Sequence, residues 1–183
     1  NEAVMSRVRT GPIFSLPNAL EERVAQKLVD LIPCAESVRF FKTGSEATEA
    51  AIRVARAATG RDVVLTCGYH SWHSWYAATR IEAPGIPRVY KSLAIPFTYN
   101  DLQSLDKEIA WTNRSWEREG PRRFVVPGVA AIILEPTLIE PPTPGFLEGV
   151  RERATRIGAV LIFDEMVTGF RWHAGGYQAA CGV

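Results

Sequence analysis

The chain has 183 residues, of which 46% are hydrophobic and 22% are charged, and its formal net charge is +1. This composition fits a soluble globular protein with an extensive core, and a near-neutral charge gives no argument for a nucleic acid or an anionic membrane as partner. No apolar run approaches the ~20 residues that a membrane-crossing helix needs. From the charge and the missing apolar run together, we expect neither a membrane nor a nucleic-acid partner.

The cysteines are odd in number and lack the spacing of a metal site: Cys34, Cys67 and Cys181. Since no signal-peptide pattern opens the chain either, we expect reduced thiols, a cytoplasmic location and no metal centre. Asn1 is not an initiator residue, and no closing helix is predicted before Val183. We therefore expect the chain to be a fragment.

The first third of the chain predicts a helix, a short strand and a second helix. Residues 20–31 carry apolar side chains at helical spacing, and Pro33 stops the pattern. Residues 38–41 are predicted to form a short strand. An Ala-rich helix is predicted over residues 43–58, and Gly60 ends it.

The middle of the chain is less regular. We expect a strand over residues 62–66, a turn at residues 68–70 and a helix over residues 72–80. Residues 84–96 predict a loop followed by a short extended piece.

A turn and helix cap at residues 99–101 precede a predicted helix over residues 102–110. Residues 112–127 are rich in charge and hold two prolines, which is typical of a surface insertion.

Two wholly apolar runs, residues 129–134 and 159–163, predict strands buried on both faces. Between them lie a Pro-rich loop over residues 140–145 and a predicted helix over residues 146–157. Strands that alternate with helices indicate parallel βαβ units. We therefore expect one α/β domain whose mostly parallel sheet is flanked by helices.

Two acids, Asp164 and Glu165, directly follow the second apolar run, and a Thr168-Gly169 turn comes next. The carboxyl end of a central strand is where open α/β sheets bind their ligands. Burying a carboxylate there is costly unless a cation or a strong donor meets it. Asp164 therefore predicts a positively charged ligand group, and a protonated heterocycle nitrogen would serve.

Residues 43–46, Thr-Gly-Ser-Glu, have the pattern of a capping box. Gly44 allows a ligand to approach the backbone closely, and the free N–H groups of a first helical turn favour an anion. An ordinary helix start explains the same residues. Since the glycine patterns of a P-loop and of a Rossmann fold are both absent, a phosphate without a nucleotide signature stays open.

Aromatic residues gather at the turn over residues 68–73, where Tyr69 can lie flat over a planar ligand. His70 and His73 are three residues apart, but no third ligand completes a familiar metal spacing. Aromatic packing is the alternative for these side chains, and for Trp72 and Trp75 it is the preferred interpretation.

Glu135 and Asp164 each follow an apolar strand, so parallel strands would bring both acids to one edge of the sheet. For either acid alone, capping of the next element or contact with a surface cation is an equal alternative. The two acids, the helix start at Thr43 and the aromatic turn together define one pocket at this edge.

These residues resemble class III aminotransferases of fold type I, which use pyridoxal phosphate. The ending Thr168-Gly-Phe-Arg171 looks most like the glutamate-1-semialdehyde aminomutase branch and its aminotransferase relatives. The resemblance runs along nearly the whole chain, through residues 14–17, 40–49, 60–62, 69–70, 135–136, 144–147 and 164–171. It implies a partial large domain over residues 1–183, with the cofactor phosphate held by Thr43, Gly44 and Ser45.

The resemblance also implies how the cofactor ring is held. Tyr69 would stack on the pyridine ring with His70 beside it, and Glu135 would lie near cofactor and substrate. Asp164 would pair with the ring nitrogen, because an opposite charge favours its protonated form. Met166 would pack on the other face of the ring, since residues two apart in an extended segment point the same way.

The chain departs from the family pattern in several places. Ser71 stands where the family commonly has Gly, and Met166 where Val is usual. The lysine that forms the Schiff base lies downstream of the Asp-Glu motif in the family, beyond Val183, and so does the small C-terminal domain. The lysines present stand elsewhere: Lys27, Lys42, Lys91 and Lys107.

The resemblance implies a homodimeric enzyme that moves an amino group between a small-molecule amino donor and an aldehyde or keto acceptor. A non-catalytic remnant that acts only in binding or dimer pairing is the alternative, and the missing lysine favours it. A generic phosphate-binding α/β domain is a third interpretation, because one fold serves many functions.

Overall fold

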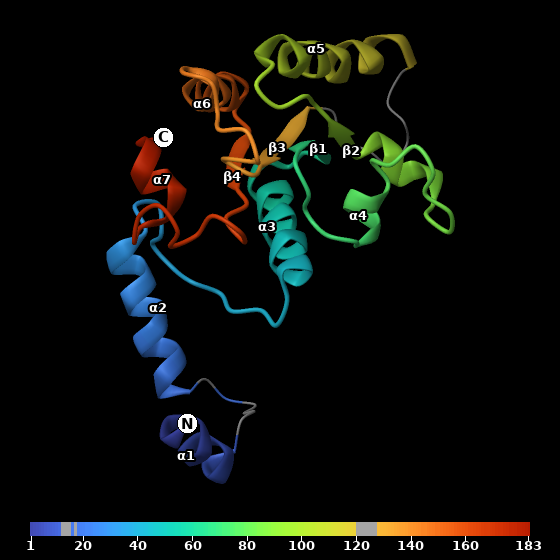
Figure 1. Cartoon of the computed structure of the whole chain (residues 1–183). Coiled ribbons are helices and arrows are strands. Elements are labelled where there is room, and N and C mark those ends of the chain that lie inside the picture. The colour runs from blue at the N-terminus through green and yellow to red at the C-terminus, as the bar shows by residue number, and fades with distance from the viewer. Residues whose placement is uncertain (12–15, 17, 120–127) are drawn as a thin grey trace. The chain divides into compact units, whose positions relative to one another are not determined.

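The computed structural model describes residues 1–11, 16, 18–119 and 128–183, without the side chains of residues 114–119. The chain divides into two compact units, residues 1–39 and residues 40–183 (Figure 1). The sheet and the predicted site lie wholly within the second unit. The expectation of one partial large domain over residues 1–183 stays a prediction.

The described part of the first unit contains the helices α1 (Glu2–Thr10) and α2 (Ala19–Leu31). The sequence patterns predicted α2 but not α1. Asn18 caps α2, because its side chain accepts the N–H of Leu20 at 2.9 Å. The predicted strand over residues 38–41 is wrong, since this segment pairs with no strand of the described sheet and runs as irregular chain.

The second unit is built on a parallel sheet. Its strands are β1 (Val63–Cys67), β2 (Ala94–Pro96), β3 (Val129–Leu134) and β4 (Val160–Phe163). Their order is β2-β1-β3-β4, and all three pairings are parallel. The predicted α/β class with a parallel sheet is therefore confirmed.

Helices cover both faces of this sheet (Figure 1). On one face, α3 (Gly44–Thr59) and α4 (Ser74–Ala77) pack their buried residues against alternate strand positions such as Val64 and Ile133. On the other face, α5 (Leu102–Glu119) and α6 (Phe146–Ile157) pack against the intervening positions such as Leu65 and Ile132. Successive strand side chains point to opposite faces, so both central strands are buried throughout.

The burial predicted for the last strand is only partly right. Val160 is 36% exposed and the other β4 residues are half-buried. The reason is position, because in the described sheet β4 pairs with β3 alone and forms an edge. Asp164 therefore follows an edge strand of the described sheet rather than a central one.

The expected surface insertion at residues 112–127 is also corrected. The helix α5 continues to Glu119, and Thr112 is buried. The inward positions Leu105, Ile109 and Thr112 recur at helical spacing, which carries the helix past residue 110. Residues 120–127, and all but Leu16 of the 14–17 segment, lie outside the described part of the chain.

Three short elements differ from expectation. The helix predicted over residues 72–80 shortens to α4, because Thr79 and Arg80 form tighter turns with carbonyls three residues back. A 3₁₀ helix, η1 (Arg88–Ser92), precedes β2, and α7 (Gly176–Cys181) stands where no helix was predicted.

Candidate functional site

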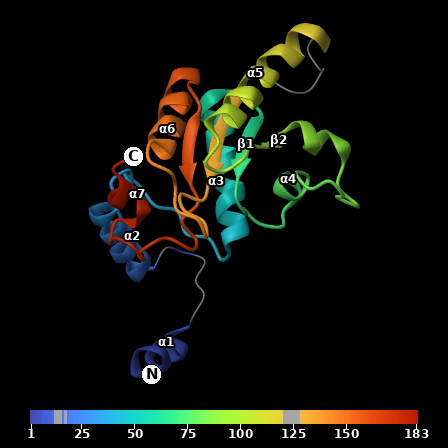
Figure 2. The ribbon, with the colours of Figure 1, turned by 45° about the horizontal axis from the view of Figure 1, so that its top comes forward.

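The carboxyl ends of β1, β3 and β4 meet at one edge of the sheet, as the sequence predicted. The arrowhead of β4 points toward the end of the sheet at which α3 begins (Figure 2). A pocket of about 290 Å³ lies at this edge, and we call it the sheet-edge pocket. It is lined by Gly44, Ser45, Tyr69, His70, Ser71, Glu135, Asp164, Met166 and Val167.

The first turn of α3 forms one wall of this pocket. The predicted capping box is present, since Thr43 Oγ1 accepts the Glu46 N–H at 3.3 Å and Glu46 Oε2 accepts the Thr43 N–H at 2.9 Å. The amides of Gly44 and Ser45 lack intrahelical acceptors, because they belong to the first helical turn. Of the three residues predicted for phosphate binding, Gly44 and Ser45 line the pocket, whereas Thr43 caps the helix and does not.

Gly44 lies directly against Met166. A Cβ at this position would lie 2.0 Å from Met166 Sδ, so any larger residue here would require the Met166 side chain to move. Met166 itself is not part of an extended segment, because β4 ends at Phe163 and residue 166 lies in a turn. The alternation argument for Met166 is therefore wrong, although the side chain does line the pocket.

His70 is buried beneath the pocket and is held at both ring nitrogens. Its Nδ1 lies 2.8 Å from Asp164 Oδ2, and its Nε2 lies 3.0 Å from the carbonyl oxygen of Cys67. A carbonyl can only accept, so Nε2 carries a hydrogen. One further proton must then lie between Nδ1 and Oδ2, which makes His70 and Asp164 a hydrogen-bonded pair with no net charge.

Asp164 is 7% exposed, and its second oxygen, Oδ1, accepts the N–H of Met166 at 3.2 Å. A buried acid at a strand end is stabilised by such partners. The structure thus places Asp164 in the same pocket as the first turn of α3, as the sequence predicted.

Glu135 follows β3 and lines the sheet-edge pocket together with Tyr69 and Asp164. Its Oε1 accepts the N–H of Tyr69 at 2.7 Å, and its backbone continues the ladder between β3 and β1. The predicted meeting of Glu135 and Asp164 at one edge is confirmed. Tyr69 is 65% exposed, so much of its ring stays accessible to a ligand.

The two tryptophans of the aromatic turn behave differently. Trp75 is 2% exposed and packs in the core, as predicted. Trp72 is 75% exposed, which contradicts its preferred interpretation as a packed side chain. Its ring makes an edge contact with His73, at 5.3 Å between ring centroids.

Sequence reasoning missed the role of Glu165. Its carboxylate accepts the N–H groups of Tyr177 at 2.5 Å and Gln178 at 3.1 Å. It therefore holds the first turn of α7, and the second acid of the Asp-Glu pair is structural. No local pattern could reveal this, because the partners stand twelve and thirteen residues away.

The described residues hold no group of three metal-ligating side chains, and their cysteines are free. Among the same residues, no helix is both long and apolar enough to cross a membrane. His73 and His173 do not line the sheet-edge pocket. His73 Nδ1 lies 3.8 Å from Glu49 Oε2, and His173 is exposed.

A parallel α/β sheet with an acid-bearing pocket at its carboxyl edge is the architecture of fold type I transferases, and comparison with known proteins agrees. Residues 2–180 match the family described as aminotransferase class-III, and the chain belongs to this family. A crystal structure of an omega-transaminase from Sphaerobacter thermophilus has the same fold, with a TM-score of 0.83 and 27% identity over 100% of this chain and 43% of that one.

Curated relatives include two differently named enzymes. The chain is 39% identical to a glutamate-1-semialdehyde 2,1-aminomutase from Syntrophobacter fumaroxidans. It is 38% identical to a 3-aminobutyryl-CoA aminotransferase from Cloacimonas acidaminovorans. Each match covers 100% of this chain and 42% of the relative, so the chain spans less than half the length of these proteins.

Proposed function

We propose that the chain forms part of an enzyme that uses pyridoxal phosphate to move an amino group between a small-molecule amino donor and an aldehyde or keto acceptor. The observation that carries this proposal is the sheet-edge pocket. It joins the first turn of α3, at Gly44 and Ser45, to the buried carboxylate of Asp164. A single small molecule can therefore reach an anion site and an acid together.

The donors at the first turn of α3 fit a phosphate. The Gly44 and Ser45 amides point out of a helix N-terminus, where the backbone dipoles favour negative charge. Beside Gly44 the Cβ position is taken by the Met166 side chain, so this residue contributes its backbone N–H rather than a side chain. We therefore assign the cofactor phosphate to these two residues, while Thr43 supports them as the N-cap.

Asp164 fits the opposite end of the cofactor. A carboxylate favours the protonated form of a ring nitrogen that lies within a few ångströms of it. Bound in this way, the cofactor supplies an electron sink for the substrate carbon that loses its proton. The residues of this chain would orient the cofactor ring and favour protonation of its nitrogen. Tyr69 and Met166 would lie on the two faces of the ring, and Glu135 would lie beside the substrate.

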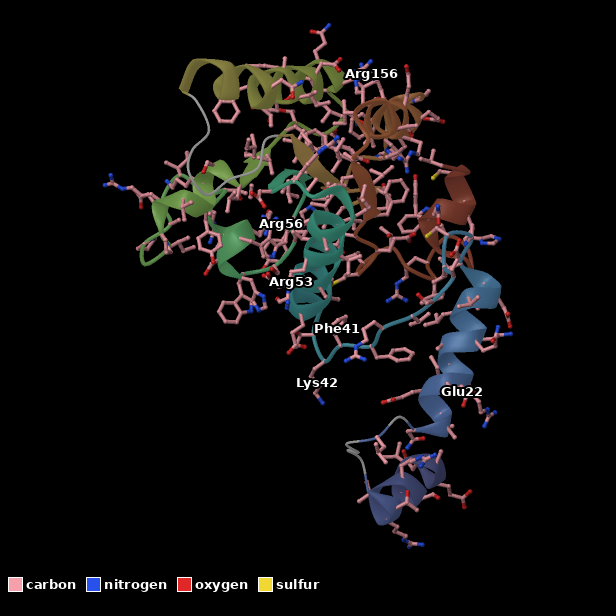
Figure 3. All side chains as sticks on the ribbon, turned by 180° about the vertical axis from the view of Figure 1, so that it is seen from behind. Glu22, Phe41, Lys42, Arg53, Arg56 and Arg156 are labelled. Carbon is pink, nitrogen blue, oxygen red and sulfur yellow. The ribbon has the colours of Figure 1, made fainter. Side chains whose placement is uncertain are left out.

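A non-catalytic protein that only binds or pairs is the second candidate, because no lysine lines the described pocket. Lys42 precedes the helix cap, but it is exposed and extends away from the sheet (Figure 3). The retained Asp164 and Gly44 favour the enzyme, and the family lysine would then lie in sequence beyond these 183 residues. Homodimer formation and a cytoplasmic location belong to the same proposal, from the family resemblance and the cysteine pattern.

Binding of pyridoxamine 5′-phosphate to the chain tests the proposal, because this amine cannot form a Schiff base with surface lysines. Calorimetric titration of wild-type protein should give one site. The Asp164→Asn variant should bind at least about tenfold more weakly, since it loses a charge-assisted hydrogen bond worth about 1.5–3 kcal/mol.

The matched control is Asp101→Asn, which removes a carboxylate outside the pocket. Asp101 caps α5, and asparagine caps helices equally well. This variant should bind the ligand like wild type. No binding by the wild-type chain, or equal binding by Asp164→Asn, would contradict the proposed cofactor site.

A further inference from the structure

The peptide unit between Gly68 and Tyr69 is held at both of its ends. Tyr76 donates its hydroxyl hydrogen to the Gly68 carbonyl oxygen at 2.5 Å, and Tyr69 donates its N–H to Glu135 Oε1 at 2.7 Å. In a trans peptide the carbonyl and the N–H point in opposite directions, so the two contacts act from opposite sides.

The sequence is adapted to this arrangement at Gly68. Its φ of +101° lies where glycine is favoured, and a Cβ there would lie 3.1–3.2 Å from three carbons of the Glu135 side chain. The close approach of Glu135 to the peptide therefore requires glycine at this position.

The residues around this peptide are fixed as well. Thr48 Oγ1 lies 3.1 Å from the carbonyl oxygens of both His70 and Ser45, and the His70 ring is bonded at both nitrogens. The Tyr76 ring meets the Tyr69 and His70 rings edge-on, at centroid distances of 5.6 and 5.4 Å. The Tyr69 ring is thus positioned through its backbone, while its own side chain stays largely exposed at the pocket.

Tyr76 is suited to the role of donor. Burial, followed by the charge of Glu135, raises the pKa of its hydroxyl above the ordinary value. The hydroxyl therefore keeps its proton at neutral pH and can continue to donate to Gly68.

We propose that Tyr76 and Glu135 are positioning residues, which clamp the Gly68–Tyr69 peptide so that the Tyr69 ring forms a fixed wall of the sheet-edge pocket. Glu135 then acts as an acceptor for a backbone amide rather than through its charge on a ligand. Only the ligand-binding consequence of this inference rests on the proposed function.

Hydrogen exchange of the Tyr69 amide, followed by NMR in the ligand-free chain, tests the clamp directly. The amide should exchange slowly in wild type. Tyr76→Phe and Glu135→Ala should speed its exchange by about three- to tenfold or more, as expected for the loss of a hydrogen bond. Glu135→Gln should keep most of the protection, because its amide oxygen still accepts the Tyr69 N–H.

Tyr99→Phe is the matched control, since Tyr99 donates its hydroxyl hydrogen to the Pro136 carbonyl at 3.1 Å outside the pocket lining. It makes the same chemical change and should leave Tyr69 exchange unaltered. If Glu135→Ala fails to fold, the exchange rate of the Tyr69 amide in Tyr76→Phe tests the clamp on its own. Wild-type exchange in Tyr76→Phe would overturn the clamp.

Titration with pyridoxamine 5′-phosphate gives the second readout. Tyr76→Phe should weaken binding by about three- to tenfold, Glu135→Gln should bind more tightly than Glu135→Ala, and Tyr99→Phe should stay near wild type. If Glu135→Gln binds as weakly as Glu135→Ala yet keeps its Tyr69 protection, the charge of Glu135 acts on the ligand and the inference is wrong. Failure of wild type to bind overturns the proposed cofactor site, while the exchange result still decides the clamp.

Discussion

The Nδ1 atom of His70 lies 2.8 Å from Oδ2 of Asp164, and the two side chains are 0% and 4% exposed. Because Nε2 already donates to the Cys67 carbonyl, this short contact must contain a proton. Asp164, at the end of β4, is therefore buried together with its hydrogen-bond partner His70. Its other oxygen, Oδ1, accepts only the Met166 amide among the described contacts and keeps acceptor capacity for a ligand.

Removing one member of this pair should be costly. His70→Phe leaves the Asp164 carboxylate buried without its partner, and breaking a buried pair in this way costs about 3–5 kcal/mol. Adding Asp164→Asn should recover part of the loss, because the unpaired charge is gone. Urea unfolding of the two single variants and the double variant measures the coupling. Additive losses would show that the two side chains do not interact.

Ser71 carries strain that glycine would relieve. Its φ is +116°, a conformation that costs a residue with a Cβ about 1–3 kcal/mol. The gain in Ser71→Gly is offset in part by the greater freedom of glycine in the unfolded chain. We expect a net stabilisation of about 0.5–1 kcal/mol, seen as a higher urea midpoint.

Ser71→Ala is the control for that prediction. Alanine removes the same hydroxyl, which accepts the His73 N–H at 3.3 Å, but it keeps the Cβ and the strain. Its midpoint should not exceed that of wild type. An equal gain in both variants would place the effect in the hydroxyl rather than in the backbone.

Much of the fold could be predicted because local and tertiary signals agree. The core strand β3 is wholly apolar and β1 is apolar except for Thr66, while Thr43 and Gly60 mark the ends of α3 and Gly158 marks the end of α6. The strand predicted over residues 38–41 does not form, because a strand needs a neighbouring strand to pair with. A short apolar run in the sequence does not show whether such a neighbour exists. The length of α5 was missed because charged residues on its outer face obscured the apolar spacing.

The site was predictable in outline, since parallel strands bring their carboxyl ends to one edge. What could not be predicted are contacts between distant residues, such as the bond from His70 to Asp164 and the hold of Glu165 on α7. Thr43 does not line the described pocket and its hydroxyl accepts the Glu46 N–H, so its predicted part in phosphate binding stays a prediction.

Gly176 should tolerate substitution poorly. It has a φ of +80°, and a Cβ there would lie 2.5 Å from Glu165 Oε1, the carboxylate that holds α7. Gly60 has a φ of +64° but open space around its Cβ position. Gly60→Ala should therefore cost about 1 kcal/mol, whereas Gly176→Ala should cost clearly more, because it also displaces Glu165. Equal unfolding midpoints for the two variants would be evidence against this role of Glu165.

Cys67 should be unreactive in the folded protein. Burial, followed by the charge of Glu135, raises the pKa of its thiol to about 12. At pH 8 only about one molecule in ten thousand would then carry the reactive thiolate. Iodoacetamide labelling followed by peptide mass spectrometry should modify the exposed Cys34 and spare Cys67. After unfolding in urea both should react, and equal labelling of the two thiols before unfolding would contradict the burial of Cys67.

The protonation state of the bound ligand tests the central electrostatic claim. Pyridoxamine 5′-phosphate labelled with ¹⁵N at the ring nitrogen reports this state through its chemical shift when bound to the chain. We predict the shift of a protonated ring at pH 8 in wild type and an unprotonated shift in Asp164→Asn. An unprotonated ring in the wild-type complex, or the same shift in both proteins, would contradict the assignment of Asp164 to the ring nitrogen.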